Sequence, residues 1–508
     1  MRKNSIIKGT LILTIAGLLT RIIGFFYKIF LSNALGPEIL GVYSLIFPIY
    51  GICFTLYASG IQTGISKLVA EEYGKGNEKN AKKILRTGLI GSVVIAFALS
   101  LVVYMGSDFI ARNYLMEAQS AASLRILSYA FPFCGITACI NGYYYGKKKA
   151  GIPATTQLLE QMVRVAFVYI IALFFGDGNL RITCELAVWG IVAGEIASNI
   201  FNILSLRFQK INNENKDKGN ISFARPLGKI SIPLSLNRLL ISILHSVEAV
   251  MIPTMLKRSG LSTAEALSLF GILNGMTLPF LLFPSTITNS LSVLLLPAIS
   301  EAKAKENNKL ISHIVSVSLK YSLILGIFSA GFFIYFGEPL GMSVFEVKEA
   351  GSYLTILAWL CPFLYAATTL SSVINGLGKA HLTFVNSIIG LSFRIILLAF
   401  FVPSYGIMGY LISLLVSQLL ITGLDFYIVY KFIPFPLDSI NSIVKPAIVA
   451  WFSCSFMYRI YEFVISMINV SSRMTILIIL ACCAILVIVN LTILKMFHSI
   501  VRGEWHLR

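Results

Sequence analysis

Basic side chains inside long apolar segments are the residues of this chain that could do chemistry. Arg21 and Lys28 are seven residues apart in one such segment. Seven residues advance a helix by about 700°, so both side chains would point to nearly one face, about 10 Å apart along the axis. Such a pair suits a diphosphate or another anionic head group, and Arg238 is a candidate third cation. The alternative is structural, with Lys28 reaching the polar interface and Arg21 binding free carbonyl groups.

Two further pairs of charged residues lie in apolar segments. His245 and Glu248 are three residues apart and so neighbours on a helix; they are candidates for ion or proton coupling or for a structural polar contact. Glu160 and Arg164 have the i,i+4 spacing of an intrahelical ion pair, which lowers the cost of burying both charges. We expect a structural role for Glu160 and treat Arg164 and Arg394 as candidate cavity-lining cations.

The composition places these residues in a membrane protein. Of 508 residues, 56% are apolar and only 13% are charged, and the mean hydropathy is +0.81. Soluble domains carry about 25% charged residues, whereas the charges here gather between long uncharged stretches. A soluble globular, a disordered or a fibrous protein is therefore excluded. The net charge of +18 reflects loops that collect Lys and Arg, and nucleic-acid binding is not expected.

Membrane-spanning helices must position these charges, and each needs about 20 apolar residues to cross the hydrocarbon. Fourteen segments meet this length: 6–30, 39–61, 88–108, 122–142, 154–176, 183–206, 230–251, 267–296, 312–336, 350–375, 382–401, 406–430, 442–466 and 474–497. With the N-terminus in the cytoplasm, the cytoplasmic connections and termini hold 27 Lys and Arg, and the opposite loops hold six. This bias predicts an even number of spans with both termini cytoplasmic.

Short matches at an offset of 230 residues indicate an internal repeat. They are Ala70-Glu71 with Ser300-Glu301, Lys149-Ala150 with Lys379-Ala380, and Arg164 with Arg394. Gly190-Ile191 and Gly406-Ile407 are expected to open corresponding turns. In the second copy Gly390 replaces Glu160, so Arg394 must find a different partner. Six spans fit within the offset, and an even number gives both copies the same orientation.

We therefore expect an all-α membrane protein with two parallel-repeat six-helix lobes. The expected parts are an N-terminal lobe (1–206), a polar cytoplasmic linker (207–229), a C-terminal lobe (230–431), and two additional transmembrane helices with a cytoplasmic tail (432–508). Repeats of this kind build alternating-access transporters, in which the lobes move about a site between them.

Motifs for enzymatic chemistry are missing from the sequence. The eight cysteines fall in or beside apolar segments without Cys-x-x-Cys spacing, so we interpret them as small buried hydrophobic residues. No Asp-x-Asp, Walker A or His-Glu-x-x-His motif occurs. We expect no catalytic residue, no metal and no cofactor. Any energy source must then be an ion gradient, the membrane potential or downstream consumption of a transported lipid.

Four longer motifs lie along the first part of the chain: residues 8–13 (KGTLIL), 20–25 (TRIIGF), 65–71 (ISKLVAE) and 157–164 (QLLEQMVR). Together they resemble the stage V sporulation protein B family, in the polysaccharide branch of the multidrug/oligosaccharidyl-lipid/polysaccharide (MOP) exporter superfamily. The resemblance implies a fourteen-span, two-lobe fold in the bacterial cell membrane. It also implies a flippase that moves a polyprenyl-diphosphate-linked saccharide, such as the peptidoglycan precursor lipid II, to the outer leaflet.

The resemblance also implies roles and partners. Similar lipid II flippases hold the diphosphate with basic residues of the first span, so Arg21 carries over, whereas Tyr27 stands where many have Arg and Lys28 follows it. The implied partners are the lipid-linked oligosaccharide, membrane lipids and cell-wall synthesis enzymes. One alternative is an ion-coupled multidrug extruder of the same superfamily, which should prefer cavity carboxylates. Another is a membrane-embedded glycosyltransferase, which should carry carboxylate pairs.

Overall fold

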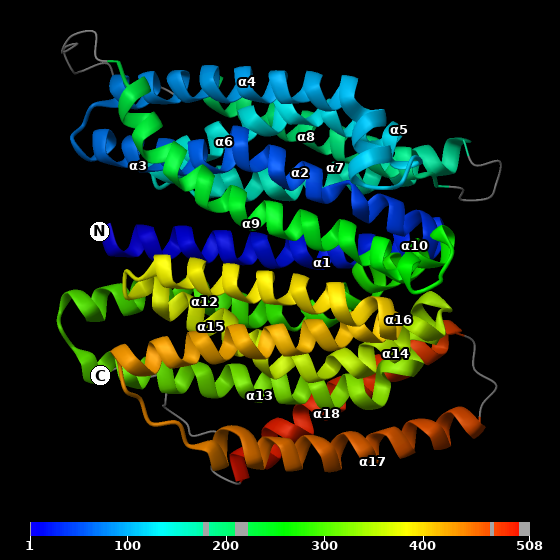
Figure 1. The fold of residues 1–508 in the computed structure, drawn as a ribbon. Coiled ribbons are helices and arrows are strands. Elements are labelled where there is room, and N and C mark those ends of the chain that lie inside the picture. Colours follow the sequence, from blue (N-terminus) through cyan, green and yellow to red (C-terminus); the bar gives the residue numbers. More distant parts are fainter. Residues whose placement is uncertain (1, 176–181, 209–221, 468–471, 497–508) are drawn as a thin grey trace. The chain divides into compact units, whose positions relative to one another are not determined.

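The computed structural model is helical throughout the ranges that it describes, residues 2–175, 182–208, 222–467 and 472–496 (Figure 1). Long apolar segments favour helices because a helix satisfies its own backbone polar groups, as hydrocarbon requires. The α-helices are α1 (Arg2–Leu45), α2 (Phe47–Phe54), α3 (Gly60–Gly74), α4 (Glu78–Phe109), α5 (Ser120–Ser128), α6 (Ala130–Gly146), α7 (Gly151–Phe175), α8 (Cys184–Arg207), α9 (Ala224–Arg258), α10 (Thr263–Gly271), α11 (Leu278–Leu282), α12 (Ser285–Ala304), α13 (Asn308–Leu340), α14 (Lys348–Leu357), α15 (Cys361–Gly376), α16 (Ala380–Phe432), α17 (Lys445–Met467) and α18 (Ser472–Met496). Short π-helices and one 3-10 helix complete the described elements: η1 (Thr55–Ser59), η2 (Ile110–Tyr114), η3 (Ile272–Thr277), η4 (Gly341–Phe345), η5 (Ala358–Leu360) and η6 (Ile440–Val444). The expected all-α fold is confirmed.

Eleven helical runs in the described ranges are long and apolar enough to cross a membrane. The number is twelve if α5 and α6, which are bent by 44° at their junction, form one span. The chain is thus a multi-pass membrane protein, although this count is below the fourteen segments expected from sequence. Two runs are far longer than the about 20 residues that one crossing needs: Thr14–Gly74 has 61 residues and Ala380–Phe432 has 53.

The 53-residue run Ala380–Phe432 is so long because α16 consists of two helical halves that fold back on each other at Gly406. The backbone there (φ 56°, ψ −141°) is accessible to glycine and strained for other residues. Asn386 Nδ2 donates a hydrogen bond to Asp425 Oδ1 at 2.7 Å. A second contact joins Arg394, eight residues after Asn386, to Ser417, eight residues before Asp425: Arg394 Nε donates to Ser417 Oγ at 2.6 Å. The two halves are therefore antiparallel, as Figure 1 shows.

Gly36 marks a similar break in α1, with φ 73° and ψ 168°, and the chain reverses there before α2 (Figure 1). Gly190 differs, because it lies inside α8, where a Cβ atom would come within 3.2 Å of the Arg164 carbonyl oxygen. The expectation that Gly190 and Gly406 open corresponding turns is wrong. Gly406 supplies backbone freedom at a reversal, whereas Gly190 supplies space between two packed helices.

The chain forms two compact units. One comprises Met1–Thr254 and Ser262–Gly271, and the other comprises Met255–Leu261 and Ile272–Arg508. Helix α9 belongs largely to the first unit because small residues bring it close to α3: a Cβ on Gly60 or Gly64 would collide with Ser235 or Ser231. This boundary differs from the one drawn at residues 207–229, because packing, and not repeat order, determines which helices cluster together.

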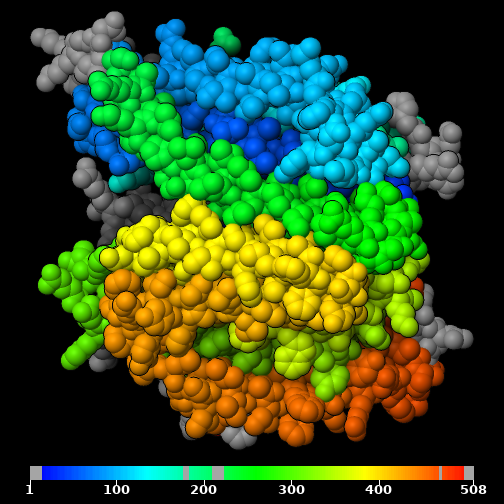
Figure 2. Space-filling model, viewed as in Figure 1, coloured from blue at the N-terminus to red at the C-terminus, as the bar shows by residue number. Residues whose placement is uncertain are grey.

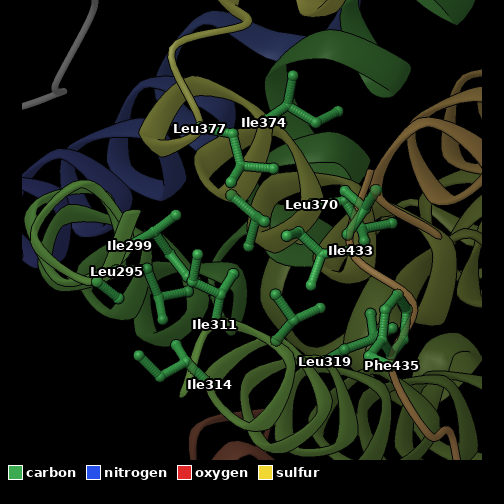
Figure 3. Close-up of a cluster of buried hydrophobic side chains, with 14 of the residues drawn as sticks. Leu295, Ile299, Ile311, Ile314, Leu319, Leu370, Ile374, Leu377, Ile433 and Phe435 are labelled. Carbon is green, nitrogen blue, oxygen red and sulfur yellow. The ribbon is translucent and has the colours of Figure 1, made fainter. Parts of the chain in front are cut away.

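The buried cores of the two units show the same 230-residue offset as the sequence matches. In the second unit, a buried hydrophobic cluster lies mainly on α12, α13 and α15 (Figure 3). In the first unit, the equivalent cluster lies mainly on α3, α4 and α6. The buried residues related by this offset are Ile65 and Leu295, Val69 and Ile299, Ala81 and Ile311, Ile84 and Ile314, Leu85 and Val315, Ile140 and Leu370, Tyr143 and Val373, and Tyr144 and Ile374. The correspondence supports the repeat.

Helix α4 presents one whole side to the surface of the first unit, as Figure 2 shows in light blue. Its exposed apolar residues recur at helical spacing along that side: Ile90, Val94, Phe97 and Leu101 are 51–64% exposed. A stripe of this kind on a membrane-spanning helix is where acyl chains make contact.

Candidate functional site

Arg21 and Lys28 lie on a continuous part of α1, and both side chains are exposed. Among the described residues, the side chain of neither forms an ion pair or a hydrogen bond, although the Lys28 carbonyl oxygen accepts from Ser32 Oγ at 2.7 Å. Leu19 and Phe26 are also exposed and seven residues apart, but the 100° helical step puts them about 160° around the axis from the two cations. The helix thus has a cationic stripe and an opposite apolar stripe.

A third side of α1 packs on α7. Gly24 lies against Gln161, whose Nε2 atom would be 3.6 Å from an added Cβ, and Phe30 contacts Tyr169 at a ring-centroid separation of 5.9 Å. Tyr27 lies on this side and is only 6% exposed. Position 27 therefore faces the interior of the first unit, and the next residue, Lys28, joins the exposed stripe with Arg21.

The interior next to Tyr27 contains charged side chains. Arg164 Nη2 donates to Glu160 Oε1, so the expected i,i+4 ion pair forms, with both side chains about one fifth exposed. Glu195 of α8 interacts electrostatically with both partners of this pair and is only 5% exposed. Close packing brings the helices together, because a Cβ on Gly194 would lie 2.7 Å from the Glu160 carbonyl oxygen. Two carboxyl groups thus lie near one guanidinium, which forms its ion pair with Glu160.

Hydroxyl and thiol groups from other helices surround these charges. The Tyr50 hydroxyl lies 3.3 Å from Cys134 Sγ, and Cys134 in turn lies against Glu195. Several buried polar atoms in this cluster have no hydrogen-bond partner within the described part of the chain. They are Tyr27 OH, Tyr57 OH, Arg164 Nε and Glu195 Oε2. We call the group of Tyr27, Tyr43, Tyr50, Tyr57, Cys134, Glu160, Arg164 and Glu195 the interior cluster.

Arg238 makes a contact that the sequence does not predict. Its Nη1 atom donates to the Ser59 carbonyl oxygen at 2.8 Å, at the junction between η1 and α3. Ser242 and Ser246 lie on the same side of α9 and contact Thr55 at 3.0 Å and Tyr114 at 2.9 Å. Arg238, Ser242 and Ser246 thus form a polar stripe through which α9 contacts η1 and η2.

The remaining candidates form local contacts. His245 Nδ1 lies 3.6 Å from Glu248 Oε2, with the His side chain 58% exposed and the Glu side chain 8% exposed. Arg394 is buried and binds Ser417, which is a different partner from that of Arg164, as expected. Among the described residues, no group of three or more His, Cys, Asp and Glu could hold a metal ion.

Glu195 did not stand out in the sequence because no basic residue lies three or four positions away on the same helix to form a recognisable pair. Its signal was present, since Glu195 stands in an uncharged stretch of a candidate span, between Glu185 and Arg207. The tyrosines of the interior cluster had no such signal. Aromatic residues are common in apolar helices, and only packing shows which of their hydroxyl groups meet.

The fold defines a polytopic α-helical membrane protein, and comparisons with known proteins agree. Residues 6–303, more than half of the chain, match the family "Polysaccharide biosynthesis protein". The chain belongs to this family.

Individual proteins show the same relationship. The chain is 27% identical over 442 residues to stage V sporulation protein B of Bacillus subtilis (strain 168), covering 85% of each chain. Its fold resembles the inward closed conformation of the lipid II flippase MurJ, with a TM-score of 0.70, 15% identity and coverage of 96% of this chain and 99% of the other. It also resembles an inward-facing multidrug resistance MATE family transporter, with a TM-score of 0.64, 16% identity and coverage of 82% and 94%.

Proposed function

We propose that this transporter flips a polyprenyl-diphosphate-linked saccharide from the inner to the outer leaflet by alternating access. Lipid II is the substrate suggested by the similarity to a lipid II flippase and to stage V sporulation protein B. The observation that carries the proposal is the cationic stripe of α1, where Arg21 and Lys28 are exposed within an apolar helix. Unpaired cations are costly inside hydrocarbon, so they favour a hydrated path and an anionic ligand.

The stripe suits a diphosphate in both charge and geometry. The two Cα atoms are separated by about 10 Å along α1, and long side chains can converge from that distance on adjacent phosphate groups. Arg21 would contact two phosphate oxygens at once, and Lys28 would add a point charge. Arg238, whose guanidinium also contacts the Ser59 carbonyl oxygen, would contribute only if that contact opens.

The proposal includes a fourteen-span topology with both termini cytoplasmic. The reversals at Gly36 and Gly406 support it, because a helical run that turns back at its middle crosses the membrane twice. Counting each of these two long runs twice, and the bent pair α5 and α6 once, raises eleven spans to fourteen. An even number keeps both ends of the chain on one side.

The ion-coupled multidrug extruder is the second candidate, favoured by the likeness to a MATE family transporter and by the buried carboxylates of Glu195 and Glu248. The cationic stripe argues against cationic drugs as its substrates. A flip assay on reconstituted vesicles separates the two. It should compare lipid II with another undecaprenyl-diphosphate sugar and with a cationic dye.

Variants test the assigned residues. Arg21→Gln and Lys28→Gln should each lower lipid flipping about 10- to 100-fold, since each removes a charged hydrogen bond to phosphate. The matched controls are Arg86→Gln, which removes a charge at an exposed site on α4, and Leu19→Ala, on the opposite stripe of α1. Both controls should flip normally. Normal flipping by a well-folded Arg21→Gln protein would refute the site, and transport of the dye alone would refute the function.

A further inference from the structure

We propose that Glu195 is a proton-binding site inside the first unit. The interior cluster holds two carboxyl groups, of Glu160 and Glu195, and one guanidinium, of Arg164. If both acids were ionised, the cluster would carry one unbalanced negative charge. Glu195 is 5% exposed, and burial of an unbalanced charge is strongly unfavourable unless a cation or a proton neutralises it.

The contacts identify which carboxyl group takes the proton. Glu160 receives a hydrogen bond from the Arg164 guanidinium, so its charge is already balanced. Glu195 does not form this ion pair, and its Oε2 atom has no hydrogen-bond partner within the described residues. An oxygen atom that is buried and unpartnered is where an added proton can reside.

Glu195 interacts with groups on several neighbouring helices: Tyr50 of α2, Tyr57 of η1, Cys134 of α6, and Glu160 and Arg164 of α7. Tyr27 and Tyr43 of α1 interact with Arg164 of the same cluster. The hydroxyl of Tyr57 is fully buried, is also unpartnered among the described residues, and interacts electrostatically with Glu195.

These neighbours favour a proton over a metal cation. Sodium and other hard cations require several oxygen ligands, whereas this cluster presents a thiol and a guanidinium among its hydroxyl groups. A fixed guanidinium also repels a metal ion, whereas protonation needs only one oxygen atom. In the proposed step, hydronium transfers H⁺ to Oε2 of the carboxylate and leaves water, and the cluster changes from a net charge of −1 to zero.

This site differs from the pair on α9, where the His245 side chain is 58% exposed and lies 3.6 Å from Glu248. Gly194 and Gly190 let α8 approach α7 closely, so the ionisation of Glu195 can alter the packing of those two helices. A role of this proton in driving lipid flipping rests on the proposed function. Binding of the proton to Glu195 is independent of the proposed function.

Infrared difference spectroscopy tests whether Glu195 binds a proton. Spectra of the purified protein are compared between acidic and alkaline pH. A band from a protonated carboxyl group in an apolar setting should titrate in the unaltered protein and vanish in Glu195→Gln. In Glu160→Gln the Arg164 guanidinium balances the charge of Glu195, so the band should titrate at lower pH, whereas the control Glu185→Gln, on the same helix, should leave it unchanged. Glu195→Asp should shift the band without removing it, which keeps the test valid if Glu195→Gln folds poorly.

The result that overturns the proposal is a band that survives Glu195→Gln, titrates unchanged in Glu160→Gln or is missing altogether. A second measurement separates this inference from the proposed function. With an imposed pH gradient, the unaltered protein should change its flipping rate severalfold and Glu195→Gln should not respond. If neither protein moves lipid while the band still titrates at Glu195, the proton site stands and the proposed function fails.

Discussion

Gly376 packs so closely on Ile299 that a Cβ atom added to the glycine would lie 2.8 Å from the Ile299 Cβ. The equivalent contact occurs 230 residues earlier, where a Cβ on Gly146 would lie 2.8 Å from Val69. The backbone neighbours correspond as well, since Gly376 faces the Leu296 carbonyl oxygen and Gly146 faces that of Ser66. Two copies of one helix-packing contact thus use glycine for the same reason.

Adding a methyl group at either glycine should destabilise the protein. Gly146→Ala and Gly376→Ala should each cost about 1–3 kcal/mol, because the neighbouring backbone cannot move away without disturbing the core. The controls are Gly51→Ala and Gly423→Ala, since nothing lies within 4 Å of a Cβ at either site. Thermal unfolding in detergent micelles measures the difference. Equal unfolding temperatures for variants and controls would contradict the packing.

Asp425, in the second half of α16, binds a side chain from the first half of α16 and another from α15. Its carboxylate accepts hydrogen bonds from Asn386 Nδ2 at 2.7 Å and from Ser371 Oγ at 2.9 Å, and it is 1% exposed. Asp425→Ala should cost about 2–3 kcal/mol because it leaves the buried Asn386 amide and the partly buried Ser371 hydroxyl without an acceptor.

A double-mutant cycle isolates the contribution of the Asn386–Asp425 pair. Asn386→Leu combined with Asp425→Leu should lose less stability than the sum of the single changes, by about 0.5–3 kcal/mol. Chemical unfolding of the four proteins measures this coupling. Strict additivity would show that the two side chains do not stabilise each other.

Cysteine labelling tests the topology. Lys75→Cys, between α3 and α4, should react with an impermeant reagent only from the cytoplasm, and Arg258→Cys, at the end of α9, only from outside. Both positions are exposed, and seven of the eight native cysteines are buried, so background labelling should be low. Labelling of Lys75→Cys in intact cells would reverse the proposed orientation.

The sequence by itself determined the helical membrane character, the heptad spacing of Arg21 and Lys28, and the Glu160–Arg164 pair. These features depend on hydropathy and on the 100° helical step, which act over a few residues. The 230-residue offset was also visible in the sequence, and it recurs between the buried cores.

Tertiary structure alone decided which distant groups meet. The contact of Arg238 with the Ser59 carbonyl, the burial of Tyr27 beside Arg164 and the position of Glu195 arise from close approaches between helices. Such approaches depend on where small residues allow two backbones to come together, which no local pattern specifies. The same reason explains why α9 packs with the first unit although it opens the second copy of the sequence repeat.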